Sequence, residues 1–302
     1  MTSKESMTLL VGDNPFHGIS HLSQERSRAR NAAVKQSEFA AGLVMSALDN
    51  GADGFMFSVS ETTLSILHDM RKNGRFCDSK LYAIVPYAYE YVRLAAQVGG
   101  VPGLGRRIGK QILLSMNGKA IVAGVRGLVS MDPEALMKTY LFYEISRLKS
   151  AAGRKALIDS VLLHEIITEM ALAFNLDWFI KSYIEFLKKQ KIKPGFETRN
   201  FALLAKKFKS WGINFNEVVI VSAFNKAGFQ MNPSKEECER ALLDASGGNV
   251  IAMSMLASGY LRLPEAANYI KTLPNLSGVV VGVSKEQHAK DTFNFLKERL
   301  GP

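Results

Sequence analysis

Short apolar runs rich in β-branched residues alternate with longer helical patterns along the whole chain, and they recur eight times. These runs cover residues 8–11, 54–59, 81–86, 159–164, 195–199, 218–222, 250–255 and 278–283. Several are continuously apolar, which is typical of parallel strands that are covered on both faces. Eight parallel strands that each lead into a helix predict an α/β fold, a (β/α)8 TIM barrel, with a functional site at the carboxyl ends of the strands.

Helical patterns fill most of the sequence between these runs. They cover residues 38–50, 63–73, 200–211, 234–245, 264–272 and 285–300. Ser234 precedes two glutamates, which is typical of the first turn of a helix. A doubly wound open sheet would show the same alternation, but it normally carries a glycine-rich phosphate loop after an early strand. The first run ends instead in Gly12-Asp13-Asn14-Pro15, so we expect one barrel domain over residues 1–302.

Residues 88–155 are too many for a single crossover, and we expect them to form a helical insertion after the third strand. Asp132-Pro133-Glu134 marks the start of a helix inside this segment. The stretch 99–126 begins with a glycine-rich, basic sequence. A lid over the site, an oligomer contact and a membrane-surface patch all remain open for that stretch.

The composition of the chain limits which classes of partner it is expected to bind. The two cysteines, Cys77 and Cys238, lie far apart and match no metal or redox spacing. No apolar stretch is long enough to span a membrane and no signal peptide is evident, so we expect a cytoplasmic protein. The formal net charge is +10, but the basic residues are spread over several helices and no nucleic-acid motif is present. The expected partner is therefore a small anionic substrate, and no nucleic acid.

Titratable side chains stand at several strand ends. His164 and Glu165 follow an apolar run, where core packing alone explains a titratable pair poorly. Neighbouring side chains of a strand point to opposite faces, so at most one of the two enters the barrel mouth while the pair stays in regular β-structure. Glu197 in the fifth run and His17 in the first loop complete the candidates for acid and base catalysis.

Other polar residues at the same ends are candidates for substrate binding. They are Asp13, Asn14, Arg199, Asn200, Ser222 and Asn225. Arg199 shares a strand face with Glu197, and the two are either a base beside an anion-binding guanidinium or a structural ion pair. Asp13 and Asn14 are also explained as caps of a tight bend. A metal site built from the carboxylates and histidines is chemically reasonable, but no dense ligand motif supports one.

Two loops near the carboxyl terminus have features of an anion site. Ser258 and Gly259 follow the seventh run, and Gly282 and Ser284 lie between the eighth run and a helix. Such loops present backbone N–H groups to phosphate, as barrels often do after strands seven and eight. A turn capped by Ser284 explains the second loop equally well. Both loops together favour a phosphate site, which the positive net charge also suits.

The second half of the chain, residues 159–296, resembles the aldo-keto reductase superfamily. Asp159-Ser160-Val161-Leu162-Leu163-His164 is similar to that family's fourth strand with its active-site histidine, and residues 249–259 are similar to its seventh strand. Val280-Val281-Gly282-Val283-Ser284-Lys285-Glu286-Gln287 is similar to the segment that holds the cofactor phosphate there. The resemblance implies a barrel, a catalytic role for His164 and NADP as a candidate cofactor.

The chain departs from that family at three of its four catalytic positions. The family also needs an aspartate and a tyrosine after strand two and a lysine at the end of strand three, and residues 57–63 and 84–87 place none of them there. Carbonyl reduction by that mechanism is therefore not favoured. The first loop, with Asn14-Pro15-Phe16, also resembles a group of uncharacterised barrel proteins, which implies the fold and no reaction.

Three hypotheses follow from these features. The first is an enzyme of aldolase, lyase or isomerase type that moves protons on a small anionic or phosphorylated substrate. The second is an NAD(P)H-dependent oxidoreductase with a rearranged catalytic set. The third is a non-catalytic barrel that binds a ligand or a partner.

Overall fold

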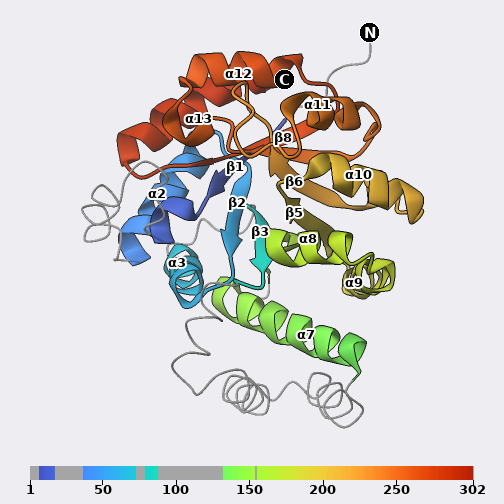
Figure 1. The fold of residues 1–302 in the computed structure, drawn as a ribbon. Helices are drawn as coiled ribbons and strands as arrows, with labels where there is room; N and C mark the ends of the chain where they lie inside the picture. Colours follow the sequence, from blue (N-terminus) through green and yellow to red (C-terminus); the bar gives the residue numbers. More distant parts are fainter. Residues whose placement is uncertain (1–6, 18–36, 73–78, 88–131, 154, 302) are drawn as a thin grey trace.

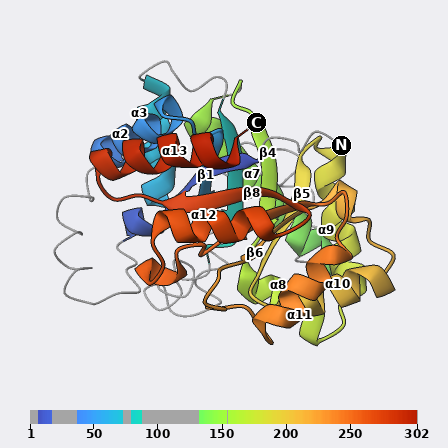
Figure 2. The same cartoon turned by 90° about the horizontal axis from the view of Figure 1, so that it is seen from above.

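A computed structural model describes residues 7–17, 37–72, 79–87, 132–153 and 155–301. Eight parallel strands form a closed barrel in sequence order, with β8 paired to β1 (Figures 1 and 2). The strands are β1 Thr8–Gly12, β2 Gly54–Ser58, β3 Lys80–Val85, β4 Ile158–Leu163, β5 Lys193–Thr198, β6 Val219–Ala223, β7 Asn249–Met253 and β8 Leu276–Gly282. The predicted (β/α)8 barrel is confirmed, and each strand lies within a few residues of its predicted position.

Helices surround the barrel on its outer side (Figures 1 and 2). The described α-helices are α2 Ser37–Asp49, α3 Glu61–Lys72, α7 Pro133–Ala152, α8 Glu165–Ala173, α9 Asp177–Lys189, α10 Phe201–Ser210, α11 Lys235–Leu243, α12 Leu263–Thr272 and α13 Glu286–Leu300. Three short 3-10 helices are η1 Asn14–His17, η2 Phe215–Glu217 and η3 Ala257–Gly259. Ser234 caps α11 by accepting a hydrogen bond from the Glu237 N–H, which matches the predicted helix start.

The helix predicted to start near Pro133 is α7. The Asp132 carboxylate accepts a hydrogen bond from the Glu134 N–H at 2.9 Å and caps it. α7 lies between β3 and β4 in the chain and packs against α3 and α9 (Figure 1). Residues 88–131 of the predicted insertion, including the stretch 99–126, lie outside the described residues. Within the described part of the chain, none of the helices has the length and apolar character that a membrane span requires.

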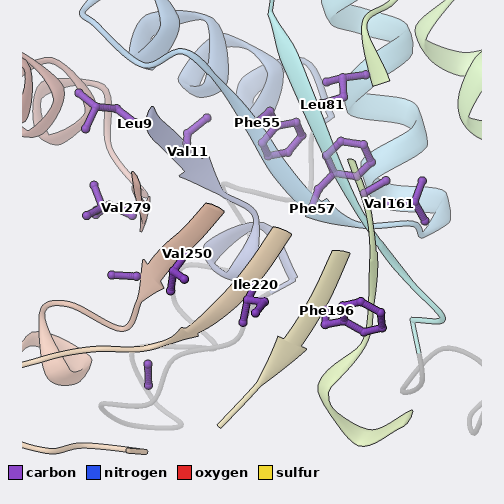
Figure 3. Packing of buried hydrophobic residues seen from close by; sticks show 14 of the residues in the cluster. Leu9, Val11, Phe55, Phe57, Leu81, Val161, Phe196, Ile220, Val250 and Val279 are labelled. Atoms are coloured by element: carbon purple, nitrogen blue, oxygen red, sulfur yellow. The ribbon is translucent and has the colours of Figure 1, made fainter. Parts of the chain in front are cut away.

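Side chains of the strands alternate between two apolar layers. The outward set packs against the helices, and Figure 3 shows at least one of its side chains from every strand. The inward set fills the barrel with Leu10, Met56, Tyr82, Ile84, Leu162, Val219, Val221, Ile251 and Val280. Apart from register shifts in the β3–β4 and β7–β8 pairs, this alternation decides which residues at the strand ends enter the barrel mouth.

Candidate active site

A cavity of about 320 Å³ opens at the carboxyl ends of the strands. Met56, Ile84 and Val280 of the inward apolar layer form its floor. Residues from the ends of β1, β4, β5, β7 and β8, and from the loop after β6, form its walls. Its volume lies within the range of small-molecule sites, at the end of the barrel where catalytic groups gather.

Glu197 is a half-buried acid of this cavity. It lies one residue before the end of β5, between Phe196 and Thr198, which both point toward the helices, so its own side chain points into the barrel. Burial, and after it the negative charge of Glu165, raise the pKa of Glu197 to about 8, although a hydrogen bond from the Glu165 backbone N–H at 3.4 Å opposes the shift. Glu197 is therefore mainly protonated at neutral pH.

His164 stands beside Glu197 as a neutral imidazole. It follows β4 directly and caps α8, where its Nδ1 accepts a hydrogen bond from the Ile166 N–H at 3.2 Å. Burial lowers the pKa of His164 below its ordinary value, and only 7% of the residue is exposed. Because Nδ1 is an acceptor, the proton of the neutral ring lies on Nε2. His164 thus offers one N–H donor in the cavity that it lines.

Both His164 and Glu165 line the cavity, although regular β-structure would admit only one. The strand ends at Leu163, and Glu165 is already the first residue of α8. The alternation of side chains in a strand therefore does not apply to His164 and Glu165, because the strand has already ended. The Glu165 carboxylate accepts a hydrogen bond from Arg199 Nε at 2.5 Å in a half-buried ion pair.

Arg199 also lines the cavity and is held from behind by α8. Glu169 Oε1 accepts hydrogen bonds from the Arg199 backbone N–H at 2.8 Å and from the Thr198 hydroxyl at 3.2 Å. This carboxylate fixes the end of β5, and with it the origin of the Arg199 side chain. The sequence gives no direct signal for Glu169, because it contacts Arg199 only through the packing of α8 on β5.

The first loop brings Asp13 and Asn14 to the cavity wall. Asp13 Oδ2 accepts hydrogen bonds from the Ser58 N–H at 2.7 Å and from His17 Nε2 at 2.9 Å. His17 does not line the cavity; its ring stands behind Asp13, 4.8 Å from the ring of Tyr87, which does line it. His17 is therefore placed to orient Asp13 and contact Tyr87 rather than to touch a ligand.

Three of the four predicted phosphate-binding residues meet at this cavity. Ser258, Gly259 and Gly282 line it, whereas Ser284 does not. The Ser258 side-chain oxygen is buried and has no hydrogen-bond partner among the described residues. Ser284 is not the cap of the last helix, because α13 has Lys285 at that position and no side-chain cap. Of the two loops expected to bind an anion, the loop after β7 thus lies at the cavity with both of its residues, whereas the loop after β8 does so only with Gly282.

Three predicted substrate-binding residues lie away from the cavity. Asn200 caps α10 by accepting a hydrogen bond from the Leu203 N–H at 3.0 Å. Ser222 pairs with Thr198 in register and shares its outward face, so it points toward the helices. Asn225 is fully buried and holds the loop after β6. Asn200 and Asn225 thus make structural hydrogen bonds, and the outward Ser222 hydroxyl has no partner among the described residues.

Of two further polar residues that line the cavity, Gln230 was not indicated by the sequence, and Ser254 was indicated only by its place at the end of the seventh run. Gln230 arrives from the loop after β6, and Ser254 follows β7 directly. Both have a positive φ, of 59° and 55°, which is uncommon for residues other than glycine. Ser254 could be found as the residue after a strand, whereas Gln230 depends on a loop conformation that has no local sequence pattern.

Within the described residues, no group of three or more metal-ligating side chains is arranged to hold an ion. On the β7 and β8 side the cavity wall offers the unpartnered Ser258 hydroxyl, Gly259 and Gly282. The catalytic positions do not fit the nicotinamide chemistry of the resembling family, because β2 ends in Ser58 and β3 ends in Val85, followed by Pro86.

Comparison with known proteins supports the fold alone. No family model matches the chain, and no curated protein does. A provisionally assigned aldo-keto reductase from Pseudomonas aeruginosa superposes with a TM-score of 0.57 at 12% identity, over 99% of this chain and 93% of that one. An aldo-keto reductase from Bacillus halodurans, in its holo form, gives a TM-score of 0.53 at 11% identity, over 99% and 96%. The chain thus shares the (β/α)8 barrel fold of these two structures.

Proposed function

We propose that this protein is an enzyme that moves a proton next to a carbonyl group of a small phosphorylated substrate, as an isomerase, lyase or aldolase does. The observation that carries the proposal is the pairing of Glu197, whose pKa is raised to about 8, with the neutral His164 in one cavity. A carboxyl group whose pKa lies near the working pH exchanges protons efficiently in both directions.

In this mechanism Glu197 is the acid and base, and His164 is the electrophile. At pH 7, about 10% of Glu197 is ionised if its pKa is about 8. The ionised carboxylate removes a proton from the carbon beside the carbonyl, and the electron pair moves onto the carbonyl oxygen. The N–H of His164 at Nε2 donates a hydrogen bond to that oxygen and stabilises the negative charge. In an isomerisation Glu197, now protonated, returns the proton to the former carbonyl carbon, and the hydroxyl proton of the deprotonated carbon passes to the former carbonyl oxygen as that hydroxyl becomes the new carbonyl. In an elimination the proton goes to the leaving fragment as the electron pair returns from the oxygen.

The charges and polar groups of the cavity support one placement of the phosphate group. Asp13 and the Glu165–Arg199 pair lie on the β1, β4 and β5 sides and leave no unpaired cation there among the described cavity residues. Ser258, Gly259 and Gly282 lie on the β7 and β8 side, with the unpartnered hydroxyl. We therefore assign the phosphate to the β7 and β8 side and the reacting carbonyl to the side of Glu197.

Proton exchange with solvent tests this function directly. The protein is incubated in D2O with small phosphorylated aldoses and ketoses, and loss of the carbon-bound proton is followed by 1H NMR. We expect exchange with at least one substrate, reduced about 100-fold or more in Glu197→Gln and His164→Ala. The exposed Glu298→Gln is the matched control and keeps the wild-type rate. An exchange rate that Glu197→Gln leaves intact refutes the proposal.

A nicotinamide-dependent oxidoreductase is the second candidate, and the shared barrel and the phosphate-binding features of the β7 loop favour it. Because the catalytic residues at the ends of β2 and β3 do not fit, we derive no hydride step. Titration with NADPH, followed by its fluorescence, distinguishes the two candidates. Tight binding that Ser258→Ala weakens supports the oxidoreductase, whereas absence of binding at high micromolar concentration excludes it.

A further inference from the structure

We propose that Gln230 and Ser254 form a hydroxyl-binding face of the cavity, and that this face selects a substrate with hydroxyl groups beside its reacting carbonyl, as in a sugar phosphate. The inference rests on the proposed function and names the substrate class of the same site. It is carried by the position of these two side chains, by their free hydrogen-bonding groups and by the charges around them.

Strand order places this face between the two ends of the proposed substrate. The acid and base groups come from the ends of β4 and β5, and Gln230 comes from the loop after β6. Ser254 follows β7, and the phosphate-binding residues follow β7 and β8. In a closed barrel with strands in sequence order, a ligand that runs from Glu197 to Ser258 passes the β6 and β7 positions on its way.

The Gln230 loop is a built structure. The buried Asn225 side chain binds both backbone groups of Phe229: its Oδ1 accepts from the N–H at 2.8 Å, and its Nδ2 donates to the carbonyl at 2.8 Å. The Asn232 N–H donates to the Arg199 carbonyl at 2.9 Å, which ties the loop to the end of β5. The left-handed backbone of Gln230 is thus held from both sides, as strained residues at binding sites are.

The polar groups of this face are incompletely satisfied. The Ser254 hydroxyl donates to Gln230 Oε1 across a long 3.4 Å. The two N–H groups of the Gln230 amide have no partner among the described residues. A hydroxyl group of a ligand both donates and accepts, so it can accept from the amide N–H and donate to the serine oxygen. This combination of donor and acceptor suits a neutral hydroxyl.

The charges of the cavity favour a neutral hydroxyl over a carboxylate at this face. Asp13 and Glu165 carry the negative charges of the described cavity wall, and Arg199 is already paired with Glu165. A second anionic group near Glu197 would be repelled by Asp13 and would meet no unpaired cation there. A hydroxylated carbon next to the carbonyl avoids this cost.

The test compares two phosphate esters that differ only in their hydroxyl groups, glycerol 3-phosphate and propyl phosphate. Binding to the full chain is measured by ligand-observed NMR titration. We expect the wild-type protein to bind glycerol 3-phosphate about tenfold more tightly than propyl phosphate, since each hydroxyl makes a net favourable hydrogen bond. In a Gln230→Met/Ser254→Ala variant the two esters should bind equally.

A control and a second variant keep the test decisive. Gln287→Met/Ser65→Ala makes the same chemical changes on exposed helix surfaces and should keep the tenfold preference. If the first variant does not fold, as judged by circular dichroism, Gln230→Asn replaces it, because asparagine tolerates the left-handed backbone while its amide is one methylene shorter. Its preference should also fall.

The outcomes separate this inference from the proposed function. Equal binding of the two esters to the wild type, a preference that survives in Gln230→Met/Ser254→Ala, or no binding of either ester overturns the hydroxyl-binding face. Proton exchange that depends on Glu197 would still stand in each of these cases. Loss of the preference in the variant, with the exchange intact, supports both.

Discussion

Glu197→Gln should stabilise the protein in alkaline solution while it removes the proposed activity. In the folded protein the pKa of Glu197 is raised to about 8 from an ordinary value of 4.5, chiefly by burial. Between these two values the unfolded chain releases a proton that the folded chain retains. The free energy of unfolding therefore falls as the pH rises through this window and is unaffected by this group outside it. One pKa unit corresponds to 1.36 kcal/mol, so the full loss is on the order of 5 kcal/mol.

The assay is urea unfolding of the wild type and of Glu197→Gln at about pH 5 and about pH 9. A glutamine does not ionise, so the free energy of unfolding of the variant lacks this fall with rising pH. We expect similar stabilities near pH 5 and a variant that is more stable by several kcal/mol near pH 9. Glu298→Gln, at an exposed position of α13, should follow the wild type at both values. A difference between variant and wild type that is the same at both pH values would refute the raised pKa of Glu197.

Three further predictions concern the support of the site. Glu169→Ala removes the acceptor that holds the Arg199 backbone at 2.8 Å, and should raise the KM for an anionic substrate about tenfold while the pH profile of kcat stays unchanged, as steady-state kinetics would show. Gly282→Ala would place a Cβ 2.9 Å from Pro15 Cδ, and should lower the free energy of unfolding by about 1–3 kcal/mol in urea titrations. Tyr183→Phe removes a buried hydroxyl that donates to a backbone carbonyl at 2.8 Å, and should cost about 1 kcal/mol in the same titrations.

The barrel could be predicted because its signal is local and repeated. Each strand is a short run rich in β-branched residues. The observed strand ends differ from the predicted ends by a residue or two, but each run was recognised as a strand. Asp132-Pro133-Glu134 marked the start of α7 correctly, because a cap acts within one helical turn. The place of α7 between α3 and α9 could not be predicted, since it depends on contacts between distant parts of the chain.

The site was predictable where a strand end alone decides the position of a side chain. Glu197, His164 and Asp13 reach the cavity from such ends. Ser222 was assigned to the mouth because it follows an apolar run, but the register with Thr198 turns it outward. Pairing registers are tertiary information, and no single strand reveals its own.

Loop residues were the least predictable part of the site. Gln230 reaches the cavity through a left-handed turn that Asn225 holds, and neither feature follows from a local pattern. Asn225 itself was expected to bind substrate, because a polar residue after a strand is also what a binding residue looks like. The full burial of Asn225 indicates a structural role rather than a binding role, and burial can be known only from the folded structure.

The close approach of Pro15 to Gly282 joins the beginning and the end of the polypeptide at the cavity wall. Gly12 of β1 pairs with Gly282 of β8, so the last strand helps to hold the segment that carries Asp13, together with the hydrogen bond from Ser58 of β2. A nascent chain that lacks β8 would therefore have its central strands and no completed pocket. Ligand binding should appear during refolding together with barrel closure, as its final event, and should serve as a reporter of it.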